Sequence, residues 1–312
     1  MQRTAKPRRR KRLRDLSALL FLGTFACRGE LATPASDPVK VQAAVARPSS
    51  AAAQPVSPSA QAKPETVPAS EPRPWPPTGT GATSDFCIDG VGVLDESSCY
   101  ALPDAPTQEL LIYLHGTVPP TRTSPQKTNF QTVVSRASRR AHVAALMPRG
   151  RQGLAPKGQT AWWGWPTSGE QYRALARELI ADLADKRQKL EALTSQPFTR
   201  LYLAGSSSGA YFVVALALSG DLPAHGFAAI SGGAVGPGHD FSGLTPAPFY
   251  VGYGTLDTVS TASRSLAAQL RRAGWPVLLS AHPLPHGAAD IYLDEAFTFF
   301  RLPVDAERSS GS

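Results

Sequence analysis

Residues 201–213 read LYLAGSSSGAYFV, in which two apolar runs are joined by the short polar stretch GSSSG (205–209). The first run has the continuous apolar character of a strand buried on both faces of a sheet, and the second is typical of an apolar helix. Their junction fits the pattern G-x-S-x-G. Between a strand and a helix, this pattern predicts a sharp turn that holds its middle serine, Ser207, in strained dihedral angles.

Ser207 is the candidate nucleophile of this turn. Its hydroxyl would project at the N-terminus of the following helix, where the backbone N–H of Ser208 is placed to donate to a developing oxyanion, helped by the helix dipole. Ser206 and the Ser208 hydroxyl are poorer candidates, because the turn presents only its middle residue in this way. The alternative is a Gly/Ser linker or a helix-capping serine, which the apolar flanks disfavour.

From Ser84 onward, short β-rich runs alternate with longer helical patterns, which is typical of a mostly parallel sheet with crossover helices. The runs predicted as strands are 109–114, 142–148, 199–205, 226–231, 248–254 and 276–282. The stretches predicted as helices are 129–140, 169–193, 210–218, 260–273 and 288–300. We therefore expect an α/β domain over 84–305, entered by an antiparallel pair formed by 86–94 and the segment near Tyr100.

A serine nucleophile needs a base, and the base needs an acid that orients it. Asp257 follows the predicted strand FYVGYG, and His286 follows the last predicted strand. Both lie beyond the carboxyl ends of their strands, the edge at which open parallel sheets bind ligands. His282 is the rival base, but it lies too early, at the end of its strand. The alternatives are a helix-capping or turn role for Asp257 and a surface-loop position for His286.

The second donor to an oxyanion is expected in the loop after the strand LLIYL. Thr117, directly after His115 and Gly116, is the natural candidate through its backbone N–H. We interpret His115 as structural rather than catalytic, because it precedes the glycine that makes the turn.

Four motifs, YLHGT, LAGSSSGA, GYGTLDTVS and LPHG, occur in this order and together resemble the α/β-hydrolase superfamily over nearly all of 109–300. The HG loop, the ISGG at 230–233 and the GTLD are similar to phospholipase/carboxylesterase enzymes and to polyhydroxybutyrate-depolymerase-like or feruloyl-esterase-like secreted esterases. The resemblance implies a mostly parallel central sheet with helices on both faces. It also implies that Ser207 attacks a carbonyl carbon, that His286 takes and returns the proton, and that Asp257 holds the imidazole. No metal or cofactor is expected.

The stretch WWGWP (162–166) lies between a predicted strand and a predicted helix. Trp163 and Trp165 are candidates for lining an acyl or aromatic substrate pocket. The equally favoured alternative is that they pack a loop onto the domain.

The chain's net charge of +8 is concentrated at its start, because the first 26 residues hold eight Lys or Arg side chains and one Asp. The rest is near neutral, so we expect no nucleic-acid partner. The basic segment runs into LSALLFLGTFA (16–26), which is too short to span a bilayer and is typical of an export signal over 1–27. Cys27 resembles the lipidated cysteine of a bacterial lipoprotein. We therefore expect a periplasmic or cell-surface lipoprotein, or otherwise a secreted protein.

Residues 28–83 are rich in Pro, Ala and Ser and have few large apolar side chains, so a disordered linker is expected there, as is a disordered tail at 306–312. Cys87 and Cys99 are close in sequence, and an exported chain would oxidise them to a disulfide. Two buried thiols are the alternative.

These features predict an exported serine hydrolase that cleaves a small-molecule or polymeric carboxylic ester. A peptidase or amide hydrolase on the same fold is one alternative, since the same three residues serve both reactions. A noncatalytic surface-binding lipoprotein is the other, because fold does not fix function.

Overall fold

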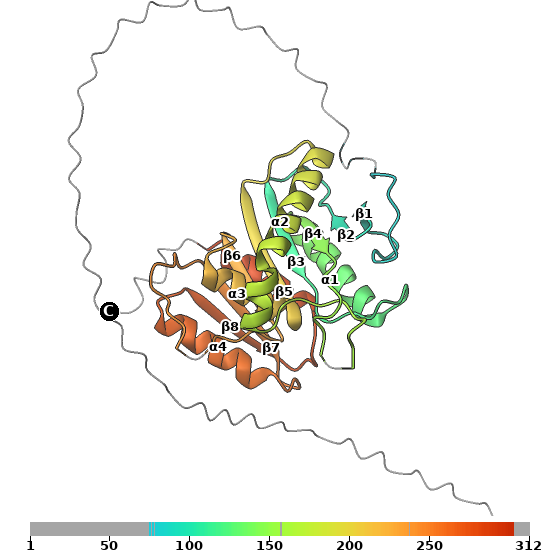
Figure 1. Ribbon diagram of the computed structural model, residues 1–312. Helices are drawn as coiled ribbons and strands as arrows, with labels where there is room; N and C mark the ends of the chain where they lie inside the picture. Colours follow the sequence, from blue (N-terminus) through green and yellow to red (C-terminus); the bar gives the residue numbers. More distant parts are fainter. Residues whose placement is uncertain (1–74, 76, 78, 157, 237, 303–312) are drawn as a thin grey trace, which may run out of the picture. The chain divides into compact units, whose positions relative to one another are not determined.

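The computed structural model describes residues 75, 77, 79–156, 158–236 and 238–302 (Figure 1). The predicted export signal, Cys27, most of the predicted linker and the C-terminal tail lie outside these residues. Two residues at the end of the predicted linker contact the domain: Trp75 Nε1 donates to Pro103 O at 3.0 Å, and Thr80 Oγ1 donates to Val93 O at 2.7 Å. Among the residues described, no helix has the length and apolar character needed to cross a membrane.

One sheet forms the centre of the domain (Figure 1). Its strands in the described part of the chain are β1 (Gly92–Asp95), β2 (Ser98–Ala101), β3 (Glu109–Leu114), β4 (Ala144–Pro148), β5 (Arg200–Ser206), β6 (Gly226–Ile230), β7 (Phe249–Gly254) and β8 (Val277–His282). They lie in the order β1-β2-β4-β3-β5-β6-β7-β8. The strands from β4 to β8 in this order are parallel, whereas β2 is antiparallel to both β1 and β4.

Helices pack on both faces of this sheet. They are α1 (Pro125–Ala141), α2 (Gly169–Thr194), α3 (Ser208–Ser219), α4 (Ser260–Arg272) and α5 (Asp290–Phe300). Buried side chains of α2, α3 and α4 share one hydrophobic cluster, and those of α1 and α5 share another on the opposite face. The alternating apolar runs therefore predicted the fold class correctly, as a mostly parallel sheet covered on both faces by helices.

Helix α1 begins at Pro125, four residues before its predicted start at 129. Ser124 is its N-cap, with extended dihedral angles and a side chain that accepts a hydrogen bond from the backbone N–H of Lys127. A serine followed by proline in the first turn is a helix-start signal, because proline lacks only an N–H that has no partner there. The earlier start adds Gln126 to the helix, one turn before Asn129, and both residues lie beside the candidate site described below.

The antiparallel entry to the sheet is the hairpin β1–β2, as predicted. A disulfide joins Cys87 to Cys99 in β2, with Cα atoms 5.6 Å apart, which confirms that prediction. Phe86, next to the disulfide, is fully buried and its ring packs against His115 and Phe130. The disulfide therefore fixes a segment that supports the loop after β3.

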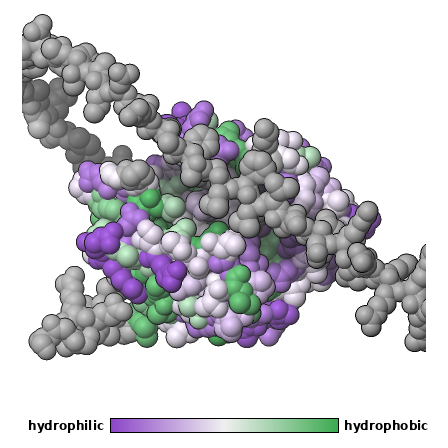
Figure 2. All heavy atoms as spheres, turned by 90° about the horizontal axis from the view of Figure 1, so that it is seen from below, coloured by the Kyte–Doolittle hydropathy of each residue, from purple (hydrophilic) through white to green (hydrophobic). Residues whose placement is uncertain are grey.

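The surface of the domain mixes polar and apolar side chains. Seen from below, apolar residues lie as separate small patches among polar ones (Figure 2). The exposed large hydrophobic side chains of the described residues are Leu256, Ile291 and Leu302. Scattered exposure of this kind is normal for a globular domain.

Candidate active site

Ser207 occupies the turn between β5 and α3, with φ 52° and ψ −120°. A non-glycine residue with positive φ is strained, at a cost of about 1–3 kcal/mol, and persists only where its surroundings hold it. Here Ser207 N donates to Ile230 O at 3.0 Å, and Ser207 O accepts from Ala210 N at 3.0 Å. The predicted sharp turn is confirmed, and these contacts with β6 and α3 hold it in place.

The two glycines of the turn are required by close approach. A Cβ on Gly209 would lie 1.9 Å from the carbonyl oxygen of Leu114, and a Cβ on Gly205 would lie 2.6 Å from the carbonyl carbon of Gly209. Both distances are far below a real carbon contact. The glycines therefore let α3 start directly against β3 and β5, and this fixes Ser207 at the carboxyl edge of the sheet.

Asp257 and His286 meet at the same edge. Asp257 follows β7, and its Oδ2 lies 2.8 Å from Nδ1 of His286, which follows β8. The Asp257 side chain is 1% exposed, and its Oδ1 accepts from Val259 N at 3.1 Å. Because a carboxylate only accepts hydrogen bonds, Nδ1 of the neutral imidazole donates, and Nε2 is left as the proton-accepting nitrogen.

A cavity of about 270 Å³ joins Ser207 and His286. Its wall also includes the loop after β3, the first two turns of α1 and the residues directly after His286. No hydrogen bond joins the side chains of Ser207 and His286 in the described structure. The structure thus brings the three predicted catalytic residues to one sheet edge, with the serine and the histidine facing a common cavity.

The two residues predicted as oxyanion donors, Thr117 and Ser208, both lie near Ser207. Thr117 lines the cavity, and a Cβ on the preceding Gly116 would lie 3.1 Å from Ser207 Cβ, so this loop runs directly against the turn. Ser208 is the first residue of α3, where backbone N–H groups have no acceptor within the helix. The structure thus places Thr117 and Ser208 next to the serine, and their role as oxyanion donors stays a prediction.

His115, which directly precedes Gly116 in the cavity wall, is fully buried, and both of its ring nitrogens contact the backbone. Its Nδ1 contacts Gly116 O, and its Nε2 accepts from Gly150 N at 2.9 Å. Burial and, to a smaller extent, the nearby Arg149 lower the pKa of His115 to about 4, against the raising effect of the Gly116 contact. The neutral ring thus links the loop after β3 to the segment after β4, in agreement with the predicted structural role.

Ser231 is a residue of this region that the sequence analysis did not single out. It follows β6, is fully buried and has φ 50°. Its Oγ accepts from Gly287 N at 3.3 Å and lies 3.4 Å from Gly287 O. These contacts anchor the loop that carries His286. The motif ISGG was noticed, but nothing in one sequence distinguishes this serine from an ordinary turn residue.

His282, the rival base, does not reach the cavity. Its Nε2 lies 3.0 Å from Ser280 Oγ and 3.1 Å from Glu295 Oε1. Glu295 in turn accepts from the hydroxyl of Tyr250 at 2.8 Å. The preference for His286 over His282 agrees with the geometry, because only His286 pairs with Asp257.

Trp163 and Trp165 do not line the cavity and instead pack the loop onto the domain. Trp165 is fully buried, and its ring stacks on Phe212 at 5.7 Å between centroids. Trp163 is 7% exposed and packs edge-on against Phe86. The substrate-binding hypothesis for these residues is therefore corrected in favour of the packing alternative. Their large apolar area is better removed from water by the core than by an open cavity.

Three residues of α1 take the place of the tryptophans in the cavity wall: Gln126, Asn129 and Phe130. The sequence analysis missed Gln126 because it started the helix at 129, and it missed Asn129 and Phe130 because it sought site residues only in loops and turns. The pair Ser124-Pro125 is the signal that would have extended the helix.

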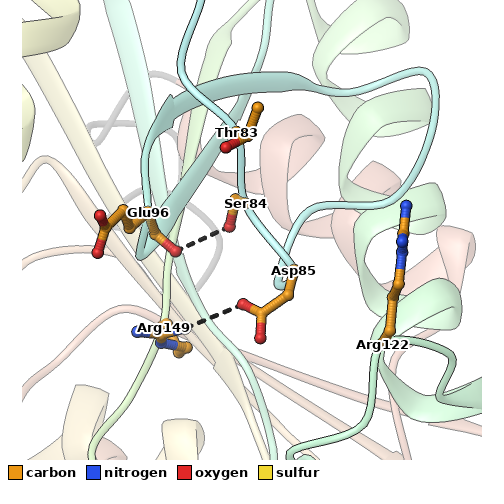
Figure 3. Close-up of a pocket in the computed structure, with 6 residues that line it drawn as sticks. All are labelled: Thr83, Ser84, Asp85, Glu96, Arg122 and Arg149. Atoms are coloured by element: carbon orange, nitrogen blue, oxygen red, sulfur yellow. Dashed lines mark hydrogen bonds and ion pairs between the residues drawn. The ribbon is translucent and has the colours of Figure 1, made fainter.

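A second, larger hollow of about 550 Å³ lies elsewhere on the domain (Figure 3). Its charged groups include Asp85 and Arg149, which pair at 3.3 Å, and Ser84 Oγ, also in its wall, donates to Glu96 O at 2.8 Å. Arg122 stands on the other side of the hollow from this pair (Figure 3). None of the predicted catalytic residues lines it. The cavity at Ser207 is therefore the candidate active site.

By sequence, no family model matches the chain, and no curated protein matches it. Solved structures resemble it at low identity. The esterase PE8 is 19% identical with a TM-score of 0.48, covering 65% of this chain and 96% of that one. A Bacillus cereus carboxylesterase is 14% identical with a TM-score of 0.49, covering 68% and 94%. A Mesorhizobium loti carboxylesterase is 19% identical with a TM-score of 0.48, covering 66% and 94%.

The chain's own geometry defines its fold class. A strained serine between β5 and α3, followed in the chain by an acid after β7 and a histidine after β8, is the arrangement of the α/β-hydrolase fold. The order of the three residues along the chain, Ser207, Asp257 and His286, is also the order of that fold.

Proposed function

We propose that this protein is a serine hydrolase that cleaves carboxylic esters, with Ser207 as nucleophile, His286 as general base and acid, and Asp257 as the orienting acid. One observation carries the proposal: the buried carboxylate of Asp257 holds His286 at 2.8 Å, and His286 shares a cavity with the strained Ser207. An acid, a histidine and a serine presented at a helix N-terminus are the elements that acyl transfer requires.

In the proposed reaction, His286 Nε2 takes the proton of Ser207 Oγ as that oxygen attacks the ester carbonyl carbon. The backbone N–H groups of Thr117 and Ser208 donate to the oxyanion that forms. The C–O bond to the alcohol then breaks, and the alcohol leaves with the proton from His286. Water attacks the acyl-enzyme in the same way and releases the acid with Ser207 restored.

His286 must approach Ser207 for the first proton transfer. Its side chain is 45% exposed, and the following Gly287 has φ 131°, a conformation in which a side chain would be strained. Catalytic hydrogen bonds are often long without substrate and shorten in the substrate complex. The cavity between the two side chains gives the ester carbonyl a place to bind before that contact forms.

We also propose that the protein is exported and tethered through a lipid at Cys27, with residues 28–83 as the spacer. The basic and apolar N-terminal segment and the Cys87–Cys99 disulfide support export, because structural disulfides persist in oxidising compartments. Expression of the full chain in a bacterial host with radioactive palmitate tests the tether. Label that is lost in Cys27→Ala is expected, and label that persists in this variant contradicts lipidation at Cys27.

Labelling with a fluorophosphonate, followed by peptide mass mapping, tests the proposed nucleophile. We expect a covalent adduct on Ser207, and no adduct in Ser207→Ala. Ser280→Ala is the matched control, since Ser280 also lies beside a histidine, and it should be labelled as the wild type is. Folded protein that neither takes the label nor turns over 4-nitrophenyl butanoate would contradict the proposed function.

A further inference from the structure

We infer that the cavity beside Ser207 selects esters that carry a neutral hydrogen-bonding group, a hydroxyl or an amide, a short distance from the scissile carbonyl. The residues that make this selection are Gln126 and Asn129 on α1. This inference rests on the proposed ester hydrolysis and specifies the substrate class of the same site.

The floor of the cavity is apolar. Val118, from the loop after β3, is 1% exposed, and Phe130, from α1, is 3% exposed, and both line the cavity. Apolar surface of this kind favours a short aliphatic segment over water. The floor alone would accept any small alkyl ester, so discrimination depends on the polar groups above it.

Asn129 supplies a fixed acceptor. Its Nδ2 donates to Ala288 O at 3.0 Å, which orients the amide and ties α1 to the residues after His286. No donor within the described chain reaches its Oδ1. An amide held by one hydrogen bond presents its oxygen at little further entropic cost, and this oxygen needs an O–H or N–H from a ligand.

Gln126 supplies a donor beside this acceptor. Its Oε1 accepts from Ser124 Oγ at 2.9 Å, so its Nε2 hydrogens point away from that contact. Within the described part of the chain, no acceptor forms a hydrogen bond with Gln126 Nε2. Gln126 and Asn129 are one turn apart on α1, so their free groups lie on the same side of the helix. A hydroxyl can satisfy both at once, because it donates to one group and accepts from the other.

The charge of the cavity wall favours a neutral group. His286 is the only titratable side chain among the residues that line this cavity, and it is already paired with Asp257. A ligand carboxylate or ammonium here would lose hydration without an opposite charge to replace it, which is costly. A hydroxyl or an amide loses less and regains its hydrogen bonds.

The cavity also continues outward at Asn129. This residue lines a neighbouring open hollow of about 630 Å³ whose other lining residues are Thr123, Ser124, Pro125 and Thr128. The polar group bound at Gln126 and Asn129 therefore sits at the mouth, in contact with solvent, and the substrate can extend beyond it. Because the contact is partly exposed, we expect each hydrogen bond to change kcat/KM by about two- to tenfold.

The test compares isosteric esters in which a hydroxyl replaces a terminal methyl. On the acyl side, the pair is 4-nitrophenyl 3-hydroxypropanoate and 4-nitrophenyl butanoate. On the alcohol side, it is 2-hydroxyethyl acetate and propyl acetate. We expect the wild type to prefer the hydroxylated ester by about five- to tenfold in kcat/KM in one of the two pairs, which then identifies the half of the ester that enters the cavity.

The variants are Gln126→Met and Asn129→Leu, with Thr128→Val as the matched control. Thr128 is on the same helix and exposed, but it lines only the neighbouring hollow. In Gln126→Met we expect the preference to fall toward one, because kcat/KM for the hydroxylated ester falls by more than kcat/KM for the methyl ester. Asn129→Leu should lose the preference too. Thr128→Val should keep it.

The outcomes separate this inference from the proposed function. Fluorophosphonate labelling of Ser207 with turnover of both esters, but with no preference in either pair, overturns the inference alone. A preference that survives in Gln126→Met and Asn129→Leu, both folded by their thermal midpoints, overturns it as well. Absence of label and of turnover in folded wild-type protein removes the proposed function, and the inference falls with it.

Discussion

Two regions of this domain bring a serine, a histidine and a carboxylate together, yet only one of them has the geometry that acyl transfer requires. Ser207, Asp257 and His286 meet at the carboxyl edge of the sheet. Ser280, His282 and Glu295 meet between β8 and α5. Their composition is nearly the same, so the difference between them must come from how the groups are connected.

The connection through the imidazole differs most. In the first region the carboxylate binds Nδ1 of His286, and Nε2 is left for the serine. In the second, Ser280 and Glu295 both contact the same nitrogen, Nε2 of His282. In the second region, therefore, the carboxylate does not orient the ring from the nitrogen opposite the serine, as proton transfer from a serine requires. The second region is therefore a set of hydrogen bonds that joins β7, β8 and α5, and it includes Tyr250.

The serines differ as well. Ser207 has φ 52° and lies before a helix N-terminus, whereas Ser280 lies inside the strand β8. A helix start presents several neighbouring backbone N–H groups without an acceptor, whereas Ser280 lies within a strand that pairs with β7, away from any helix N-terminus. The comparison teaches that a strained turn, free backbone donors and a carboxylate on the far nitrogen distinguish a catalytic serine from a structural one.

The largest expected effect is the contrast between the two serines. Ser207→Ala removes the nucleophile and should lower kcat for 4-nitrophenyl butanoate by about 10⁴- to 10⁶-fold. Ser280→Ala should leave kcat unchanged, because Ser280 contacts neither the cavity nor His286. Steady-state kinetics on both variants measure this. Wild-type turnover in Ser207→Ala would contradict Ser207 as the nucleophile, and a substantial loss of kcat in Ser280→Ala would contradict the structural role of Ser280.

The two carboxylates provide the next contrast. Asp257→Asn keeps the shape but lets the amide stabilise the wrong tautomer of His286, so kcat should fall by about 10⁴-fold with KM little changed. Glu295→Gln should lose the contact with His282 and destabilise the fold by about 1–2 kcal/mol, with kcat unaffected. Kinetics and urea unfolding of each variant separate the roles. Equal loss of kcat in the two variants contradicts the assignment.

The sequence predicted where Ser207, Asp257 and His286 lie in the fold, because the signals for their positions are local and steric. The strand-to-helix junction, the flanking Gly205 and Gly209, and the positions of Asp257 and His286 after their strands can all be read from the chain. Parallel strands then bring these ends to one edge without further information. The roles of these residues remain predictions that the variants above test.

What the sequence did not predict depends on packing between distant segments. Burial of Trp163 and Trp165 requires knowing where Phe86 and Phe212 lie. The contact of Asn129 with Ala288 joins residues far apart in the chain, and no periodicity indicates it. A tryptophan in a loop fits a pocket or a core equally well by composition, so only the three-dimensional arrangement decides.

The third histidine of this region, His115, extends the comparison from catalysis to stability. Both of its nitrogens are used, one at Gly116 O and one by the N–H of Gly150. Protonation would place a new N–H against the Gly150 N–H, so two donors would face each other in a buried site. This agrees with the lowering of its pKa to about 4.

The consequence is a loss of stability in mild acid. Because His115 has a folded pKa of about 4 against an ordinary value of 6.5, the unfolded chain binds a proton that the folded chain excludes between these pH values. The stability that the neutral ring contributes is present above pH 6.5 and is lost as the pH falls toward 4. The loss amounts to about 3 kcal/mol at 1.36 kcal/mol per pKa unit.

His115→Gln tests this with an amide that keeps one donor and one acceptor but does not titrate. Urea unfolding of both proteins should be followed from pH 7.5 to pH 4. We expect the free energy of unfolding of the wild type to fall more steeply below pH 6.5, so that its difference from the variant changes by about 3 kcal/mol over the range. Parallel curves would show that His115 is not the buried neutral group, and that the loop after β3 is held by other contacts.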